Sequence, residues 1–377
     1  MGNGENEMLL YAGIVAITTL LAWIYSHAKG KQAKRVLYVL LVMFPATISG
    51  LRGVGTDIGH YIEYASEIIS GTYDSVDYKS IFVQITRILL RYNISFQIVL
   101  FAVSIITIHV MFKIFDMYGK HISFTFGVFS YMLVFYQMSF NTYRQIMAAA
   151  FFLLATVRLF KEDDKKKFLI FYIVSVLIHN SFLPFGLVFF LRDWITEKKY
   201  LKKRVFVYIA LTIIIFCIPK MMSRMDFLLR IIPHYGWYIT RFYQSGIGFG
   251  ILRFLVMGVI PVVILRLKKT DQDMTDKKIS FLPFYITMGF VLWLTSYISE
   301  SSIYRISYNL LIALPILHGY LYKKYIKRAK SIVLVGIITI MVLFWYYDGA
   351  ILNTGETVPY KFFWEYKTKN ITFGEKV

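Results

Sequence analysis

IVLVGIITIMVL, residues 332–343, is an uninterrupted apolar stretch in a chain of 377 residues. It does not alternate between apolar and polar residues, as a strand of a membrane barrel would. Similar apolar blocks recur along the chain at lengths of roughly 16–20 residues, which suits a helix that crosses a ~30 Å hydrocarbon layer. The chain is 57% hydrophobic and 18% aromatic. The sequence therefore predicts an all-α fold, a polytopic transmembrane helical bundle.

About twelve hydrophobic helices can be placed, and residues 1–377 are predicted to form a single integral membrane domain. Two of the helices, 167–179 and 181–191, are each only about 18 Å long at 1.5 Å per residue. We interpret them as a broken hairpin that turns at His179-Asn180-Ser181; the alternative is one helix over 168–191. The predicted ranges are 8–26, 37–50, 94–113, 122–140, 143–160, 167–179, 181–191, 205–219, 251–265, 279–298, 303–321 and 331–347.

The distribution of Lys and Arg predicts the orientation of the bundle, because positively charged loops stay on the cytoplasmic side. Six segments predicted to face inward hold 27 of the 42 Lys and Arg residues. A single helix over 168–191 would move the basic loop 192–204 outward, so this rule favours the hairpin. Three long segments are predicted to lie at the outer face, at 51–93, 221–250 and 348–377. Amphipathic helices lying at the outer interface are expected in the first of these.

The same charge pattern accounts for most of the net charge of +20, so nucleic acid is not predicted as a partner. The single cysteine, Cys217, excludes a disulfide framework. No H-x-x-x-H spacing and no paired carboxylate cluster suggests a metal site, and Gly53-Val54-Gly55 is followed by no Walker lysine. We predict no metal and no cofactor.

Short polar junctions interrupt the apolar spans, and all are predicted to face outward. Charged residues beside a membrane are costly to keep without a function. Arginine is also enriched on this face, and its planar fork grips a phosphate with two hydrogen bonds where lysine cannot. We therefore predict that the junctions converge on a site for a phosphate-bearing lipid. The junctions are Arg52-Gly53-Val54-Gly55-Thr56-Asp57 with Tyr61, Asn141-Thr142-Tyr143-Arg144, His179-Asn180-Ser181 and Tyr304-Arg305.

Several of these residues have alternative explanations. The three junction arginines can instead pair with Asp57 or Glu300 as structural partners. Asp57 itself can be a catalytic base or the partner of an arginine, and His179 can be a catalytic residue or a packing residue. Other arginines on the outer face are expected to extend towards lipid headgroups, as long cationic side chains do at membrane surfaces. These are Arg87, Arg91, Arg224, Arg230 and Arg253.

Taken in order, the motifs resemble those of EpsG-like, Wzy-type bacterial polysaccharide polymerases. The resemblance runs over almost the whole chain. One departure is the stretch after Asp77-Tyr78, where the family usually shows Glu-Pro-Gly-Phe and this chain has Lys79-Ser80-Ile81-Phe82, so no role of a glutamate is carried over. The matching residues are Arg52, Gly55, Thr56, Asp57 and Tyr61, then Arg144-Gln145, His179 with Ser181, Tyr304-Arg305 and Pro359-Tyr360-Lys361.

The resemblance implies a membrane glycosyltransferase that makes capsule, O-antigen or exopolysaccharide in the bacterial cytoplasmic membrane. Its donor and acceptor would be undecaprenyl-pyrophosphate-linked oligosaccharides, joined at the periplasmic or exterior face, with the bilayer and a chain-length regulator as partners. Alternatives are a lipid-linked oligosaccharide flippase, a glycan ligase and a membrane acyltransferase. We assign catalysis to His179, Asp57, Arg144 and Arg305. The predicted substrate-binding residues are Arg52, Thr56, Tyr61, Asn141, Tyr143, Gln145, Asn180, Ser181, Arg241, Tyr304 and Tyr360.

Overall fold

The structure is a computed structural model that describes residues 2–56, 81–92, 94–222, 249–267, 278–297, 302–325, 331–353 and 355–365. Within these ranges every regular element is a helix, and the only extended pairing is an isolated antiparallel bridge between Arg52 and Phe362. The predicted all-α class is therefore confirmed. The chain divides into two compact units. The first comprises Met1–Leu154, Ile170–Asn180 and Pro315–Val377, and the second Ala155–Leu169 and Ser181–Leu314.

Five helices in the described part of the chain are long and apolar enough to cross a membrane. They are Met8–His27, Lys31–Gly50, Phe96–His121, Tyr143–Glu162 and Leu334–Leu352. Shorter apolar helices cover Phe124–Tyr136, Asn180–Phe190, Leu252–Val263 and Leu282–Ser296. Each of the twelve predicted spans corresponds to one of these helices or to a helical run described below. The chain is a multi-pass helical membrane protein.

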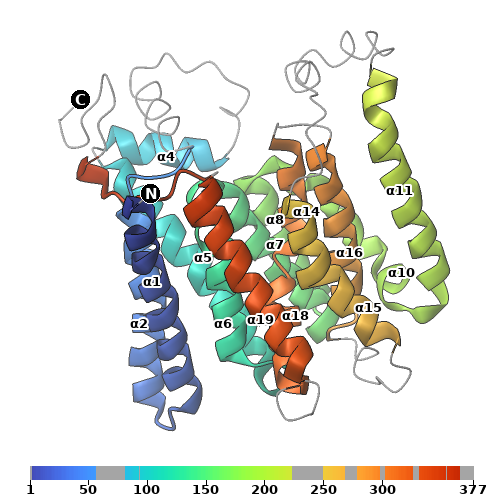
Figure 1. The fold of residues 1–377 in the computed structure, drawn as a ribbon, viewed down its shortest axis with the longest axis horizontal. Coiled ribbons are helices and arrows are strands. Elements are labelled where there is room, and N and C mark those ends of the chain that lie inside the picture. The colour runs from blue at the N-terminus through green and yellow to red at the C-terminus, as the bar shows by residue number, and fades with distance from the viewer. Residues whose placement is uncertain are drawn as a thin grey trace. The chain divides into compact units, whose positions relative to one another are not determined.

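In the first unit, α1 (Gly2–His27) and α2 (Lys31–Gly50) lie side by side and antiparallel (Figure 1). The Ser49 and Ser104 hydroxyls, 2.9 Å apart, join α2 to α5 (Phe96–Tyr118). Gly50 permits this close packing, since a Cβ there would lie 2.5 Å from the Phe101 ring. The unit also contains α6 (Phe124–Tyr131), which continues as a π-helix (Met132–Tyr136) and a 3-10 turn (Met138–Phe140), α18 (Leu314–Tyr325), and α19 (Ser331–Tyr346) with its π-helical extension (Tyr347–Leu352).

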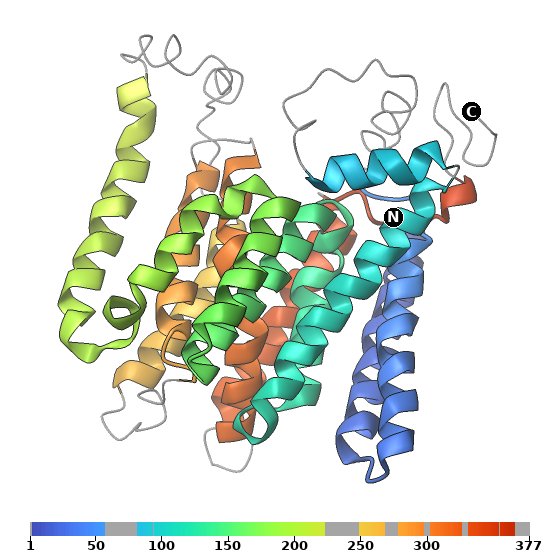
Figure 2. The ribbon, with the colours of Figure 1, turned by 180° about the vertical axis from the view of Figure 1, so that it is seen from behind.

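Helix α4 (Ile81–Arg91) confirms the amphipathic helix expected in residues 51–93. It runs across the direction of α1 and α2, at the end of the unit where α2 stops (Figures 1 and 2). Leu90 packs into a buried cluster with Phe96 and Tyr143, while Ile85 and Ile88 on another face are exposed. An apolar face that protein does not cover suits a helix lying in the headgroup region.

The second unit begins with the carboxyl end of α7 (Tyr143–Glu162) and the start of α8 (Lys165–Ile178), and it contains most of the helices between residues 181 and 314. Gly289 in α16 (Leu282–Trp293) lets Leu311 approach, since a Cβ there would lie 2.8 Å from the leucine side chain. A Thr156–Tyr285 hydroxyl pair, 2.7 Å apart, links the carboxyl half of α7 to α16. The helices are α9 (Leu187–Phe190), α10 (Arg192–Thr196), α11 (Leu201–Met222), α14 (Phe249–Phe254), a π-helix (Leu255–Val259), α15 (Ile260–Leu267), α16 (Leu282–Trp293), α17 (Tyr308–Leu311) and 3-10 helices at Asn180–Gly186, Lys198–Tyr200, Leu294–Tyr297 and Ser302–Ser307.

The broken hairpin is confirmed. The rings of Phe168, near the start of α8 (Lys165–Ile178), and Phe189 in α9 are stacked with their centroids 5.5 Å apart. One straight helix would separate residues 168 and 189 by about 31 Å at 1.5 Å per residue, so the chain must turn back between them. Arg192, just after the hairpin, also forms an ion pair with Asp163, just before α8.

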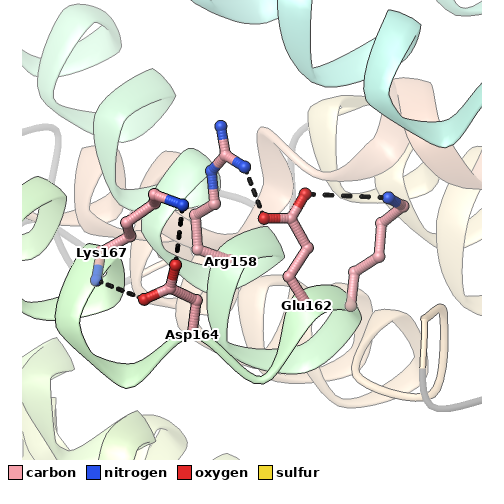
Figure 3. Close-up of polar contacts among 5 residues, drawn as sticks. Arg158, Glu162, Asp164 and Lys167 are labelled. Carbon is pink, nitrogen blue, oxygen red and sulfur yellow. Dashed lines mark hydrogen bonds and ion pairs between the residues drawn. The ribbon is translucent and has the colours of Figure 1, made fainter.

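Charged side chains surround the tight turn between α7 (Tyr143–Glu162) and α8 (Figure 3). Arg158 pairs with Glu162, and Asp164 accepts hydrogen bonds from the Lys167 backbone nitrogen at 2.9 Å and pairs with its Nζ at 2.8 Å. The hydrogen bond from Lys167 lowers the pKa of the Asp164 carboxyl. Asp164 thereby caps the first turn of α8, a favourable position for a carboxylate. This is one of the loops predicted to face the cytoplasm.

Candidate functional site

The polar loop that follows α2 is held by the far end of the chain. Arg52 forms the antiparallel bridge with Phe362. On either side of it, the Gly53 nitrogen donates to the Lys361 carbonyl at 2.7 Å and the Phe363 nitrogen donates to the Leu51 carbonyl at 2.9 Å. We refer to residues 355–363 as the C-terminal hook and to residues 52–56 as the polar loop. The hook lies within the predicted outer segment 348–377 and was not expected to contact residue 52.

Backbone hydrogen bonds to the C-terminal hook continue to the end of the polar loop. The Gly55 nitrogen donates to the Glu356 carbonyl at 3.1 Å, and the Thr56 nitrogen donates to the Gly355 carbonyl at 3.2 Å. Gly55 has a φ of +119°, a conformation that a residue with a Cβ rarely adopts. Asn141 adds a side-chain contact, because its Nδ2 donates to the Gly355 carbonyl at 3.0 Å. The chain therefore fixes the backbone up to Thr56.

The hook has its own anchors in the first unit. Tyr11 of α1 donates its hydroxyl to the Thr357 carbonyl at 2.7 Å, and Gln137 Nε2 donates to Thr357 Oγ1 at 3.4 Å. The Asn353 side-chain oxygen accepts the Thr357 and Val358 nitrogens at 3.1 and 3.2 Å. These bonds hold the hook in place independently of the loop.

The side chain of Arg52 points into the protein. It is 1% exposed, and its guanidinium donates from Nη1 to the Ser49 carbonyl and from Nη2 to the Phe140 carbonyl at 3.1 Å. The group also lies 4.9 Å from the centre of the Phe140 ring. Both carbonyls stand at the carboxyl ends of helical segments, where positive charge is favourable. Arg52 thus ties α2 to the end of the α6 run, and a contact of its guanidinium with substrate stays a prediction.

Tyr360, predicted to bind substrate, lies in the hook and donates its hydroxyl to the Ile48 carbonyl at 2.7 Å. Its ring packs edge-on against Tyr11 and Phe362. Burial raises the pKa of Tyr360, and the nearby Arg52 charge opposes this only in part. The hydroxyl is therefore protonated at neutral pH and able to donate, as this hydrogen bond requires.

Arg144 lies at the amino terminus of α7, in a buried stretch. Between Thr142 and Ala150 it is the one residue whose side chain is not buried. Tyr143 packs its ring against Phe82 of α4 at 5.9 Å, and Arg144 lies 6.0 Å from the same Phe82 ring. Gln145, the next candidate, is buried. The first amide groups of a helix carry partial positive charge, so Arg144 and the α7 terminus together favour an anion.

His179 lies at the same end of the first unit as Arg144. Helices α7 and α8 pack along each other through the ring pairs Phe151–Phe171 and Phe152–Tyr172. Ile178, at the end of α8, packs on the cluster that contains Tyr143. His179 follows directly and is half-buried, and Asn180 is exposed. The unit therefore gathers four predicted junction residues at one end: Arg52, Asn141, Arg144 and His179.

The second unit contains the other described candidates. Ser181 Oγ accepts a hydrogen bond from Asn309 Nδ2 at 3.3 Å. Tyr304 and Arg305 are partly exposed. The Tyr304 ring packs edge-on against Trp293 at 4.9 Å, in an aromatic group that also includes Phe254 and Tyr308. Asp57, Tyr61 and Arg241 lie outside the described residues.

Sequence reasoning missed the hook as a partner of the polar loop. The signals available were Asn353 and Gly355, turn-forming residues that follow the last apolar span. They show that the chain turns there, but not where the turn packs. The described residues contain no group of three or more His, Cys, Asp or Glu side chains placed to hold a metal ion.

These features define a multi-pass helical membrane protein with arginine-bearing polar segments at helix ends. The sequence model of the EpsG family matches residues 35–368, which is most of the chain. The chain belongs to the EpsG family, and this membership indicates a function in polysaccharide biosynthesis at a membrane. No curated protein and no solved structure matches the chain.

Proposed function

We propose that the protein is a polysaccharide polymerase that joins undecaprenyl-pyrophosphate-linked oligosaccharide repeat units at the outer face of the bacterial cytoplasmic membrane. Family membership supports a polymerase. The observation that carries the mechanism is the placement of Arg144: a cationic fork with exposed surface at the amino terminus of α7, at the same end of the unit as His179 and the polar loop.

In the proposed reaction, a sugar hydroxyl of one lipid-linked unit attacks the anomeric carbon of the first sugar of the growing chain. The new C–O bond forms, the bond from that carbon to the phosphate oxygen breaks, and the lipid pyrophosphate leaves with the electron pair. Negative charge grows on the leaving phosphate. Fixed cationic donors in a poorly hydrated site stabilise such charge strongly. Arg144 and the α7 terminus are the proposed donors, and Arg305 is a second proposed phosphate ligand.

The attacking hydroxyl must lose its proton, and His179 or Asp57 is proposed to accept it. A positioned base contributes roughly 10²–10⁴-fold to such a step. His179 is half-buried and stands at the end of α8, so it combines surface access with a fixed backbone. Asp57 follows directly on Thr56, where the polar loop is held by the hook.

The remaining candidates are proposed to hold the saccharide. Among the described tyrosines, Tyr304 is partly exposed and can pack on a sugar ring, whereas Tyr143 is buried against Phe82. Thr56, Asn180 and Ser181 offer hydrogen bonds to sugar hydroxyls. Tyr61 and Arg241 keep this assignment on the sequence pattern alone. The proposed partners are the two lipid-linked oligosaccharides, the bilayer and a chain-length regulator.

The proposal is tested in cells that lack the chromosomal copy of the gene and carry plasmid variants. Wild type should restore surface polymer. Arg144→Lys and Arg305→Lys should accumulate normally in the membrane but leave single lipid-linked units, because an ammonium cannot reproduce a bidentate grip on phosphate. Arg91→Lys, on an exposed turn of α4, is the matched control and should restore polymer.

The location of the accumulated units separates polymerase from flippase. Units that a periplasmic or external glycosidase can digest have already crossed the membrane, which supports a polymerase. Units that stay protected until the membrane is opened would identify a transporter and contradict the proposal. Polymer of normal length from both Arg144→Lys and Arg305→Lys would contradict the proposal that these two arginines bind the phosphate.

A further inference from the structure

Asn141 is enclosed between two glycines from opposite ends of the chain. A Cβ on Gly55 would lie 2.5 Å from Asn141 Oδ1, and a Cβ on Gly355 would lie 2.9 Å from Asn141 Nδ2. Both distances are shorter than real contacts allow. The side-chain amide therefore fills the space between the polar loop and the hook, and neither glycine can gain a methyl group without displacing it.

The amide also has a directed bond. Its Nδ2 donates to the Gly355 carbonyl at 3.0 Å, and the same carbonyl accepts the Thr56 nitrogen at 3.2 Å. One carbonyl of the hook is thus bonded both by Asn141, three residues before Arg144, and by the last described residue of the polar loop. Asn141 consequently sets the spacing between the loop and the start of α7.

The hook is fixed from the other side as well. Tyr11 and Gln137 donate hydrogen bonds to Thr357, and the side-chain oxygen of Asn353 accepts hydrogen bonds from the backbone nitrogens of Thr357 and Val358. Because these anchors come from α1, from the α6 run and from the hook's own turn, the hook is a rigid support. The loop rests on it through the bonds from Gly53, Gly55 and Thr56.

We infer that Asn141 and the C-terminal hook form a positioning device for the polar loop, and that Asn141 acts through Gly55 and Gly355 rather than by binding substrate. The device fixes the backbone at Thr56, directly before the candidate base Asp57. This inference rests on the proposed function for its catalytic consequence, while its structural part stands on the contacts alone. Small misplacements of a reacting group lower turnover strongly, so the device should act on kcat.

The test uses purified full-length protein in liposomes with isolated lipid-linked repeat units as substrate. Asn141→Ala should lower kcat about tenfold, the equivalent of one hydrogen bond, while KM changes less than about twofold. Asn141→Asp keeps the size of the side chain but loses the donor, so it should behave like Asn141→Ala. Gly355→Ala should lower kcat by at least as much, because its Cβ collides with the amide.

The decisive result comes from the double variant. Shortening Asn141 to alanine removes the atom that a Cβ at residue 355 would strike, so Asn141→Ala/Gly355→Ala should be no worse than Asn141→Ala alone. Coupled sites show this kind of non-additivity. Gly55→Ala is the matched control: its positive φ makes any Cβ strained, so Asn141→Ala should not rescue it.

Three outcomes would overturn the inference. A rise in KM of tenfold or more with kcat unchanged would make Asn141 a substrate ligand. Lower stability of Asn141→Ala with normal kcat and KM would make it a structural residue only. If the fold-changes in kcat of the two single variants multiplied in the double variant, Asn141 would not act through Gly355. Hydrogen exchange at residues 52–56 should be faster in Asn141→Ala than in wild type. This measurement does not depend on polymer formation. It therefore tests the positioning of the polar loop even if the proposed function is wrong.

Discussion

Replacing Arg52 by lysine separates a structural arginine from a catalytic one. The Arg52 guanidinium is 1% exposed and donates to two backbone carbonyls, those of Ser49 and Phe140, with the Phe140 ring against its face. A lysine ammonium is a point charge on a flexible stem and cannot span both acceptors. One charge-assisted hydrogen bond, worth about 1.5–3 kcal/mol, is lost, together with a cation–π contact worth about 1 kcal/mol.

The expected cost of Arg52→Lys is therefore about 2–4 kcal/mol of folding free energy. With an unfolding entropy of roughly 2 cal/mol/K per residue, this corresponds to a melting temperature lower by about 3–5 °C for a chain of this length. Thermal unfolding of the purified protein in detergent measures it. Arg144→Lys is the matched control, because its side chain is not buried; it should melt within about 1 °C of wild type and yet form no polymer.

The reverse pattern would assign the two arginines differently. If Arg52→Lys melts like wild type but has lost polymer formation, the guanidinium contacts substrate rather than the two carbonyls. If Arg144→Lys melts several degrees lower, its loss of activity reflects unfolding, and the proposed phosphate grip loses its support.

Three further predictions concern orientation, the base and the hook. With Cys217 replaced by serine, a cysteine at exposed Asn180 should react with an impermeant maleimide from outside, whereas cysteines at Lys166 and Lys199 should not; the opposite pattern would invert the predicted orientation. His179→Gln should accumulate normally but leave repeat units unjoined, because the attacking hydroxyl loses its proposed proton acceptor; robust polymer from this variant, with none from Asp57→Asn, would move the base to Asp57. Tyr360→Phe should retain the ring packing and lose one hydrogen bond, lowering the melting temperature by about 1–2 °C with polymer length unchanged; a shift in polymer length instead would indicate that the hydroxyl contacts the glycan.

The helical spans and the hairpin could be predicted because hydropathy and charge are local properties. Twelve blocks of apolar residues gave twelve helical runs, and the basic residues of loop 192–204 favoured a turn at His179 that the Phe168–Phe189 stack confirms. The π-helical and 3-10 interruptions at Met132–Phe140, Leu255–Val259 and Tyr347–Leu352 were not predicted. Hydrophobic periodicity marks an apolar helical segment but does not distinguish α-helical from π-helical or 3-10 hydrogen bonding within it.

The positions of the helix junctions were predictable from the sequence, whereas the contacts made there were predictable only in part. The junction at Asn141–Arg144 lies where the apolar pattern breaks, so sequence alone located it. The inward turn of Arg52 could not be predicted, because its acceptors are backbone carbonyls, one of them at Phe140, far along the chain. The hook was missed for the same reason: its bonds to Gly53, Gly55 and Thr56 join backbone atoms about 300 residues apart, and such bonds leave no pattern in the sequence.

The products of the purified protein, measured in liposomes that contain isolated lipid-linked repeat units as the only glycan, distinguish a polymerase from a flippase and from a ligase. A polymerase should give a ladder of longer lipid-linked chains, with one undecaprenyl pyrophosphate released for each linkage formed, and Arg144→Lys should give no ladder at equal protein and equal melting temperature. Single units that stay unjoined but have moved to the other leaflet would contradict a polymerase and indicate a flippase. Glycan products that form only when a separate acceptor is added would contradict a polymerase and indicate a ligase.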